Sequence, residues 1–317
     1  MSESRPGLDV SVIICTYNRV TGLEVVLDAL ERQVGLEGYR WELLVVDNNS
    51  SDGTRELVAR RIAAGRLPLR YTFEPVQGKS RAMNRGVAET AAPIVVFTDD
   101  DVTIPDGWLA ALLAPFADPG CAGVGGAVTP FWEADVPAWA SESEPYRMMG
   151  GIVQYSNPAD FGPVVAPPIG ANCAYRREMF RKHGVFRLDL GHSGALPIPG
   201  EDIEFGMRLL HAGEQLVFTR AAELFHPVTR SRLTRSYFEQ WYFQRGRLEP
   251  FLAEYELSPT TPRIAGIPRY LIRELPVWTA RWLTTREPKG RFYYKLRACM
   301  AAGAIREFYR WRGARAA

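Results

Sequence analysis

The stretch Ile94-Val95-Val96-Phe97-Thr98-Asp99-Asp100-Asp101 joins a short apolar run to three consecutive carboxylates. The apolar run has the length and β-branched content of a buried strand, and Pro93 marks its start. Three carboxylates at the end of such a strand repel one another, so a positive charge is expected beside them. A divalent cation on hard oxygen ligands is the usual solution. In an open α/β sheet, ligands bind outside the carboxyl ends of the strands, where this cluster falls. For the triplet taken alone, a solvated turn is the alternative.

Outward from this stretch, strand-like and helix-like patterns alternate along the first half of the chain at the spacing of an α/β fold. Four segments have the composition of strands: Val10–Cys15, Trp41–Val46, Leu69–Phe73 and Ile94–Thr98. Three segments between them have helical spacing: Leu23–Leu30, the stretch after Gly53 through Arg61, and Lys79–Thr90. This repetition predicts a mostly parallel sheet with right-handed crossovers.

The pattern is less regular in the second half of the chain. After a strand expected at Ala122–Val128, the stretch Pro130 to Pro168 is rich in proline, serine and aromatic residues and has no clear period. A loop of that length in a compact domain is usually functional or mobile. Order returns in six segments: a strand at Ile169–Tyr175, a helix from Arg176, a second helix at Glu201–Ala212, short strands at Gln215–Thr219 and Ala222–Phe225, and a helix at Tyr237–Tyr255.

Composition places the chain among ordinary globular proteins. It is 46% hydrophobic and 23% charged, which leaves ample material for a core, and no apolar run approaches the 18 residues that a spanning helix needs. The four cysteines are widely spaced and form no CxxC pair, which is typical of reduced thiols in the cytoplasm.

Four motifs carry a resemblance to a known family. They are Val12-Ile13-Ile14-Cys15-Thr16-Tyr17-Asn18-Arg19, Val45-Val46-Asp47-Asn48-Asn49-Ser50-Ser51-Asp52-Gly53-Thr54, Asp99-Asp100-Asp101 and Gly200-Glu201-Asp202. In this order and at these spacings they resemble the inverting family 2 glycosyltransferases, from about Val10 to His226. The resemblance implies the GT-A (Rossmann-like) α/β fold, with a mostly parallel sheet flanked by helices and a C-terminal helical extension.

The motifs and the patterns together predict two domains. Residues 1–235 are expected to form the GT-A catalytic domain, with a nucleotide-binding half at about 8–128 and an acceptor half at about 129–235. Residues 236–317 are expected to form a basic, aromatic-rich helical extension.

The expected donor-binding residues lie mainly at strand ends. Thr16 ends the first strand close to where a nucleotide would bind, although a plain polar turn would also explain it. By resemblance, Asp47 accepts the N3–H of uracil, and Arg81 reaches the base or the phosphates, with Lys79 as the weaker candidate. Asn172 is expected to bond a sugar hydroxyl. The predicted nucleotide-sugar-binding set is Thr16, Tyr17, Asn18, Arg19, Asp47, Arg81, Asp99, Asp100 and Asn172.

The resemblance also distributes roles among the three aspartates. Asp99 bonds the ribose hydroxyls, Asp101 binds the metal, and Asp100 assists or faces solvent. His226 falls where many GT-A enzymes offer a further metal ligand, with a satisfied interior or loop histidine as the alternative. Oxygen ligands together with phosphates suit Mg²⁺ or Mn²⁺, and an imidazole indicates tolerance of Mn²⁺.

Glu201 and Asp202 open the helix expected at Glu201–Ala212. Two carboxylates at a helix N-terminus can simply complement its dipole. By resemblance, Asp202 is the catalytic base that removes the proton of the acceptor hydroxyl as it attacks the anomeric carbon. Glu201 would orient the acceptor or raise the pKa of the base. A single displacement of this kind inverts the anomeric centre.

The sequence therefore predicts an enzyme of the hexosyltransferase type. It is expected to pass one sugar from a nucleotide-sugar, in particular a UDP-sugar, to a lipid-linked or saccharide hydroxyl in cell-envelope polysaccharide synthesis. A nucleotidyltransferase is the rival enzyme, but it needs a glycine-rich loop where Thr16-Tyr17-Asn18-Arg19 stands. A non-catalytic nucleotide-sugar-binding protein is the other alternative, and it predicts a broken metal or base motif, whereas both motifs are intact.

The last part of the chain is basic and rich in aromatic residues. From Arg263 to Ala317 there are 13 basic and 3 acidic residues, while the rest of the chain has a balance of −8. Such helices can lie in a membrane interface, which would give peripheral membrane contact through 263–317 at the inner face of the membrane. They can equally pack on the catalytic body or on a second subunit of a homodimer. Nucleic acid binding has no other support in the sequence.

Overall fold

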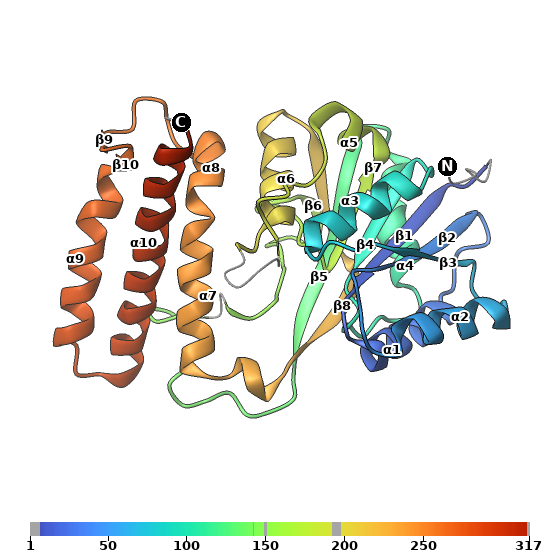
Figure 1. The fold of residues 1–317 in the computed structure, drawn as a ribbon, viewed down its shortest axis with the longest axis horizontal. Helices are drawn as coiled ribbons and strands as arrows, with labels where there is room; N and C mark the ends of the chain where they lie inside the picture. Colours follow the sequence, from blue (N-terminus) through green and yellow to red (C-terminus); the bar gives the residue numbers. More distant parts are fainter. Residues whose placement is uncertain (1–6, 142, 149–150, 192–197, 316–317) are drawn as a thin grey trace. The chain divides into compact units, whose positions relative to one another are not determined.

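Within the residues that the structure describes, 7–141, 143–148, 151–191 and 198–315, eight strands form one sheet (Figure 1). Their order is β3-β2-β1-β4-β7-β5-β8-β6. The structure is a computed structural model, and the chain divides into two compact units. The sheet unit comprises 1–131, 154–195 and 201–227, and the helical unit comprises 132–153, 196–200 and 228–317.

The first four strands are parallel, as the sequence predicts. They are β1 (Val10–Thr16), β2 (Trp41–Asp47), β3 (Leu69–Phe73) and β4 (Ile94–Thr98). In the register of the ladder, Thr16 lies opposite Asp47, and Ile14 lies opposite Thr98. The carboxyl ends of β1, β2 and β4 therefore meet at one edge of the sheet, which is where the polar motifs begin.

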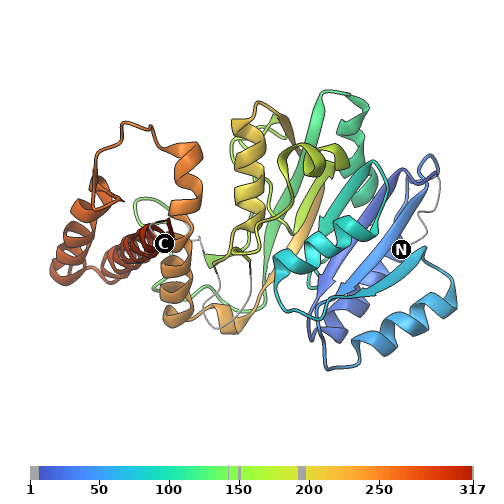
Figure 2. The ribbon, with the colours of Figure 1, turned by 45° about the horizontal axis from the view of Figure 1, so that its top comes forward.

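Helices cover both faces of this part of the sheet. They are α1 (Val20–Glu31), α2 (Thr54–Ala64) and α3 (Lys79–Glu89). Figures 1 and 2 show α1 and α2 along one face and α3 on the other. Right-handed crossovers give this arrangement, because the chain moves outward from β1 to β3 and then returns past β1 to β4.

The second half of the sheet unit adds antiparallel pairs. β7 (Asn172–Arg176) runs antiparallel to β4 and to β5 (Cys121–Trp132), and β6 (Phe161–Pro163) runs antiparallel to β8 (Gln215–Val228). The two short strands predicted within 215–225 are one continuous strand, since no glycine or proline interrupts that stretch. The helices of this half are α4 (Trp108–Leu113), η1 (Ala114–Ala117), α5 (Arg177–His183) and α6 (Glu201–His211).

An aromatic core packs α5 and α6 against the sheet. The rings of Phe180 and Phe205 stack with centroids 4.8 Å apart, and Tyr175 meets Phe205 edge to face at 5.1 Å. Phe97 of β4 meets Phe186 at 5.4 Å. This core fixes the start of α6 against the strand that carries the aspartate triplet.

The helical unit consists mainly of four helices. They are α7 (Arg235–Arg247), α8 (Glu249–Glu256), α9 (Arg269–Thr284) and α10 (Pro288–Arg315), preceded by η3 (Arg230–Arg232) and joined by the hairpin β9 (Arg263–Ile264) and β10 (Ile267–Pro268). The single helix predicted at Tyr237–Tyr255 is two helices, because Pro250 occupies the first turn of α8 and cannot continue α7.

The backbones of α7 and α10 lie close together at Gly246 and Gly303. A side chain at Gly246 would clash with the Met300 carbonyl, and one at Gly303 would clash with the Phe243 carbonyl. Such close approach requires glycine on both helices. The pairing of α7 with α10 is therefore set by these two positions.

Part of the stretch expected to be a long loop belongs to this helical unit. Trp139 meets Phe238 of α7 at 5.2 Å and Phe292 of α10 at 4.9 Å, both edge to face. The segment 132–153, of which residues 142, 149 and 150 lie outside the described ranges, thus contributes to the core of the helical unit. Among the described residues, no helix is both long enough and apolar enough to cross a membrane.

Candidate active site

Hydrogen bonds tie together the loops that follow β1 and β2. The backbone N–H of Asn18 donates to Ser50 Oγ (3.0 Å), and the N–H of Ser51 donates to Asn18 Oδ1 (2.7 Å). Asn18 itself has a positive φ of 51°, which asparagine tolerates better than most residues. The carboxylate of Asp52 accepts the N–H of Val20 (3.0 Å), the first residue of α1, and the N–H of Thr54 (3.1 Å), the first residue of α2. The Asp52 carboxylate therefore accepts hydrogen bonds from the first residues of two helices, α1 and α2.

Asp47, at the end of β2, is held by two donors. The Ser50 N–H donates to Asp47 Oδ1 and the Tyr71 hydroxyl donates to Asp47 Oδ2, each at 2.8 Å. Burial and the contact with Asp47 raise the pKa of Tyr71 to about 12, so the hydroxyl keeps its proton near neutral pH. The Asp47 side chain is buried and fixed as a hydrogen-bond acceptor. Tyr71 was not predicted as a site residue, because its pairing with Asp47 depends on the register of β3 against β2.

Two cations of this chain offset part of the negative charge of the aspartate triplet. Lys79 Nζ, at the start of α3, donates to Asp99 Oδ1 at 2.9 Å. The Arg19 guanidinium pairs with Asp101 and lies 3.9 Å from Asp100 Oδ1. The positive charge that the triplet was expected to need is thus supplied by this chain, at least in part.

His226 in β8 faces the same cluster. Its Nε2 lies 3.5 Å from Asp101 Oδ1, and its Nδ1 lies 3.1 Å from the carbonyl oxygen of Pro227. Because a carbonyl can only accept, Nδ1 carries the hydrogen, and Nε2, on the side of Asp101, is the nitrogen that would bind a metal ion. One ligand atom each from Asp99, Asp101 and His226 lie within 4.8 Å of one another. Two carboxylates and an imidazole are a donor set that Mn²⁺ accepts.

Asp202 lies at the start of α6 and is oriented by backbone donors. Its Oδ2 accepts the N–H of Gly170 at 2.6 Å, and its Oδ1 accepts the N–H of Ile203 at 2.8 Å. Burial and the neighbouring charge of Glu201 raise the pKa of Asp202 to about 6, against the opposing charge of Lys79. A carboxylate with this pKa is a better proton acceptor than an ordinary aspartate and is still ionised near neutral pH.

Lys79 links the base to the aspartate cluster. Burial alone would lower its pKa, but the charges of Asp99, Glu201 and Asp202 raise it well above the usual value. A side chain at Gly170 would come within 3.3 Å of Asp202 Oδ2 and 3.7 Å of Lys79 Nζ, so a glycine leaves this space open. Sequence reasoning placed Arg81 ahead of Lys79. The structure leaves Arg81 exposed on α3 and places Lys79 among the carboxylates, and the donor role of Arg81 stays a prediction.

Asn172 is fully buried at the start of β7. Its Nδ2 donates to the carbonyls of Ala127 (2.9 Å) and Ala222 (2.7 Å), and its Oδ1 accepts the indole N–H of Trp108 (2.8 Å). Both amide hydrogens are therefore used within the protein. We propose that Asn172 holds neighbouring strands together, in place of the sugar contact expected from the sequence.

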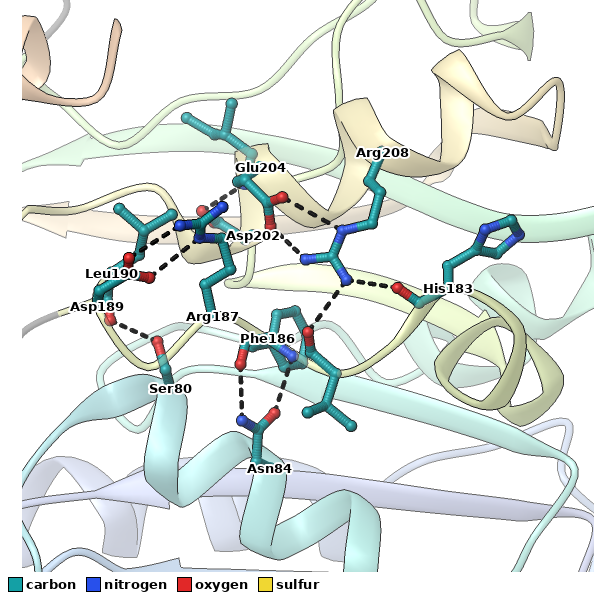
Figure 3. A network of polar contacts seen from close by, with 12 residues as sticks. Ser80, Asn84, His183, Phe186, Arg187, Asp189, Leu190, Asp202, Glu204 and Arg208 are labelled. Atoms are coloured by element: carbon teal, nitrogen blue, oxygen red, sulfur yellow. Dashed lines mark hydrogen bonds and ion pairs between the residues drawn. The ribbon is translucent and has the colours of Figure 1, made fainter. Parts of the chain in front are cut away.

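A polar network holds the segment 184–190 against two helices (Figure 3). Asn84 of α3 exchanges two hydrogen bonds with the backbone of Phe186, at 2.8 and 2.9 Å, and Ser80 Oγ donates to the Leu190 carbonyl at 2.6 Å. From α6, Arg208 pairs with Glu204 and donates to the His183 carbonyl at 2.7 Å. The network joins the helix that carries Lys79 to the helix that carries Asp202.

Comparisons with known proteins find a matching family model and similar curated proteins. Residues 11–184 match the family model described as Glycosyl transferase family 2. The succinoglycan biosynthesis protein ExoM of Rhizobium meliloti is 26% identical over 241 residues, which cover 76% of this chain and 74% of that protein. The glycosyltransferase AglE of Haloferax volcanii is 28% identical over 219 residues, which cover 69% and 66% of the two chains.

Solved structures of similar fold cover nearly the whole chain. The mannosyltransferase PcManGT of Pyrobaculum calidifontis, solved with GDP-Man and Mn²⁺, has a TM-score of 0.63 and 19% identity. The match covers 98% of this chain and 91% of that chain. At this identity the likeness concerns the fold, and it agrees with the mostly parallel sheet and flanking helices that the sequence predicts.

Proposed function

Because the chain belongs to glycosyl transferase family 2, whose members transfer a sugar from a nucleotide-sugar, we propose that its donor is a UDP-sugar. The acceptor is a hydroxyl group, and the transfer inverts the anomeric centre with the help of a divalent cation. One observation carries this proposal. The cluster of Asp99, Asp101 and His226 and the carboxylate of Asp202 all lie around the carboxyl edge of the sheet, with Lys79 beside both groups.

The choice of uridine rests on Asp47. A buried carboxylate that only accepts hydrogen bonds recognises a base with a ring N–H, such as the N3–H of uracil. Cytosine presents a ring acceptor at that position and would be rejected. Tyr71 and Ser50 hold the carboxylate in place and so favour this selection. We place Thr16, Tyr17 and Asn18 near the nucleotide because they lie at the end of β1 and in the loop after it, which a hydrogen bond joins to the turn after β2.

Asp99, Asp101 and His226 are the residues that would hold Mn²⁺ or Mg²⁺. When bound, the ion offsets the negative charge of the departing nucleoside diphosphate. Lys79 and Arg19 already pair with the carboxylates of the cluster and present further donors to a diphosphate. Asp99 was expected to bond the ribose, and its place beside Asp101 and His226 is compatible with either role.

Asp202 is the proposed catalytic base. Its carboxylate accepts the proton of the acceptor hydroxyl as that oxygen attacks the anomeric carbon, and the nucleoside diphosphate leaves from the opposite side. The neighbouring charge of Glu201 helps to raise the pKa of Asp202 to about 6, which suits proton transfer near neutral pH. One displacement on one face inverts the configuration.

The acceptor and the cellular setting are proposed more broadly. A lipid-linked or saccharide hydroxyl fits the relationship to a protein named for succinoglycan biosynthesis, and it suggests a role in cell-envelope polysaccharide. We also propose work at the inner face of the membrane, with peripheral contact through 263–317, and homodimerisation as an alternative use of that segment. The balance of 13 basic to 3 acidic residues supports the membrane contact.

A screen of nucleotide-sugars tests the donor. UDP-, GDP-, CDP- and ADP-sugars would be compared by thermal stabilisation of the protein and by slow donor hydrolysis, each with Mn²⁺ and with EDTA. UDP-sugars should stabilise the protein and be hydrolysed only with the metal. Stabilisation by a GDP-, CDP- or ADP-sugar in preference to UDP-sugars would overturn the proposed donor, and equal effects in EDTA would overturn its metal dependence.

A further inference from the structure

Helix α9 divides into an inner and an outer face with little overlap. Its buried and half-buried side chains lie on one side, among them Leu271, Trp278 and Trp282. The exposed side chains recur at helical spacing and cover the other side. They are Arg269, Tyr270, Arg273, Pro276, Val277, Ala280, Arg281, Leu283 and Thr284, which we call the α9 outer face. Successive positions turn by about 100° in an α-helix, so these nine residues form one continuous surface.

The composition of the α9 outer face is unusual for a surface in water. It carries three arginines and no acidic residue, whereas exposed helix faces usually mix both signs of charge. Two of its aliphatic side chains are well exposed, Val277 at 48% and Leu283 at 64%. The surface is therefore cationic and apolar at once.

The positive charge continues beyond both ends of the helix. Within 263–291, the exposed cations are Arg263, Arg269, Arg273, Arg281, Arg286, Lys289 and Arg291, and Glu287 is the one exposed acidic residue. Behind the surface, the rings of Trp278 and Tyr294 stack at 5.9 Å, and the Arg281 guanidinium lies 5.2 Å from the Trp278 ring centroid. The surface thus rests on packed aromatic rings, and binding there needs little ordering of the backbone.

We propose that the α9 outer face docks on the anionic surface of a lipid bilayer. The arginines pair with the phosphates of the headgroups, while Val277 and Leu283 enter the boundary between headgroups and acyl chains. This inference rests on the proposed membrane contact of 263–317 and assigns it to one face of one helix. Residues 263–317 can then pack into the helical unit and contact a membrane at the same time, because the two contacts use opposite faces of α9.

Two other occupants fit this surface less well. In a symmetric dimer the same patch meets itself, and the arginines of the α9 outer face would then face one another without a compensating acid. Nucleic acid would match the charge but would leave Val277 and Leu283 without an apolar partner. A bilayer of anionic lipids accounts for both the charge and the exposed aliphatic groups.

Flotation of the full-length protein with vesicles provides the test. The vesicles would contain phosphatidylcholine with or without one quarter phosphatidylglycerol, at low and at high salt. The double variant Arg269→Glu with Arg273→Glu is compared with Arg60→Glu plus Arg181→Glu, which makes the same change of charge at exposed sites of the sheet unit. Each arginine at such a surface is worth roughly a fivefold change in affinity, so the first variant should bind at least about 25-fold more weakly and the control should bind normally.

A second pair of variants tests the apolar part. Val277→Ser with Leu283→Ser should weaken flotation but keep its salt dependence, while Val25→Ser with Val34→Ser, at exposed sites of the sheet unit, should have no effect. Failure of the wild type to float with anionic vesicles at low salt would overturn the inference. Normal flotation of the arginine variant would also overturn it. If the wild type bound no vesicles and the arginine variant lost self-association, the α9 outer face would be a dimer interface instead.

Donor hydrolysis in solution separates this inference from the proposed function. All four variants should hydrolyse the donor at the wild-type rate with Mn²⁺, because none of the substituted residues belongs to the proposed site. Donor hydrolysis without flotation would contradict the membrane-docking proposal and leave the proposed glycosyltransferase function unaffected. Flotation without hydrolysis of any nucleotide-sugar would do the reverse.

Discussion

At the scale of single residues, Lys79 accounts for much of the electrostatics of the site. Its ammonium donates to Asp99, and the charges of Glu201 and Asp202 also act on it. Carboxylates gathered at one edge of a sheet are costly unless cations offset them. Lys79 provides that offset from the first turn of α3, and it does so for both the aspartate cluster and the proposed base.

The proposed base makes a kinetic prediction. We expect Asp202→Asn to bind donor normally and to turn over about 10²–10⁴-fold more slowly, because an amide cannot accept the proton. In the wild type, the pKa of Asp202 is raised from 3.8 to about 6, so turnover should rise with pH up to about 6 and level off above it. A pH–rate profile of kcat checks both points. A rate that stays flat down to about pH 4, the ordinary range of an aspartate, would contradict the assignment.

Tyr71 is predicted to position Asp47 for the base of the nucleotide. Tyr71→Phe removes the hydroxyl that donates to Asp47 Oδ2, so UDP should bind about fivefold more weakly, the effect of one hydrogen bond of about 1 kcal/mol. The preference for UDP over CDP should shrink, while kcat at saturating donor stays unchanged. Calorimetric titration with both nucleotides measures this. Tyr309→Phe, at an exposed position of α10, is the control. An equal loss of UDP affinity in the two variants would show that Tyr71 does not position Asp47 for the nucleotide.

At the scale of elements, the network around the segment 184–190 makes a stability prediction. Asn84→Ala removes both hydrogen bonds to the Phe186 backbone and leaves a buried N–H and carbonyl without partners. We expect the free energy of unfolding to fall by about 1–2 kcal/mol, with faster amide exchange at Phe186. Arg85→Ala, one position further along α3, is exposed and should have a much smaller effect. Urea unfolding measures the free energy of unfolding, and hydrogen exchange measures the opening at Phe186. Equal values for the two variants would show that the network does not stabilise the protein.

Which elements the sequence could predict follows from how locally each is determined. The strands β3 and β4 have the predicted bounds because residues that favour strands are followed there by turn residues, and the parallel order follows from the strand–helix repeat. The division into α7 and α8 was missed because helical periodicity continues across Leu248, although Pro250 was the available signal.

The side-chain contacts of the site were less accessible from the sequence. The burial of Asn172 depends on Trp108, Ala127 and Ala222, which are far away in the sequence and meet only through the sheet. The same holds for Lys79 and Asp99, which come from different elements. Motifs could indicate which residue types gather at the strand ends, but the pairing among them depends on the three-dimensional register.

At the scale of the whole molecule, the helical unit depends on its last helix. Arg247 Nε donates to Glu307 Oε2 at 2.7 Å, and both side chains are buried. Glu307→Ala would leave a buried arginine without its carboxylate, a change that typically costs about 3–5 kcal/mol. We expect a marked loss of thermal stability, whereas Glu133→Ala, at an exposed site of the same unit, should be neutral. Scanning calorimetry of both variants measures this, and equal melting temperatures would mean that the pair does not stabilise the unit.

The central claim is that the aspartate cluster at the carboxyl edge of the sheet forms a metal-dependent site for the nucleotide. Titration calorimetry of UDP with Mn²⁺ or with EDTA tests it most directly, on the wild type, on Asp101→Ala and on the control Asp106→Ala at an exposed position nearby. UDP should bind the wild type and the control with Mn²⁺ and should bind neither in EDTA. Asp101→Ala should fold normally and lose the metal-dependent binding. Unchanged affinity of Asp101→Ala for UDP with Mn²⁺ would contradict the account.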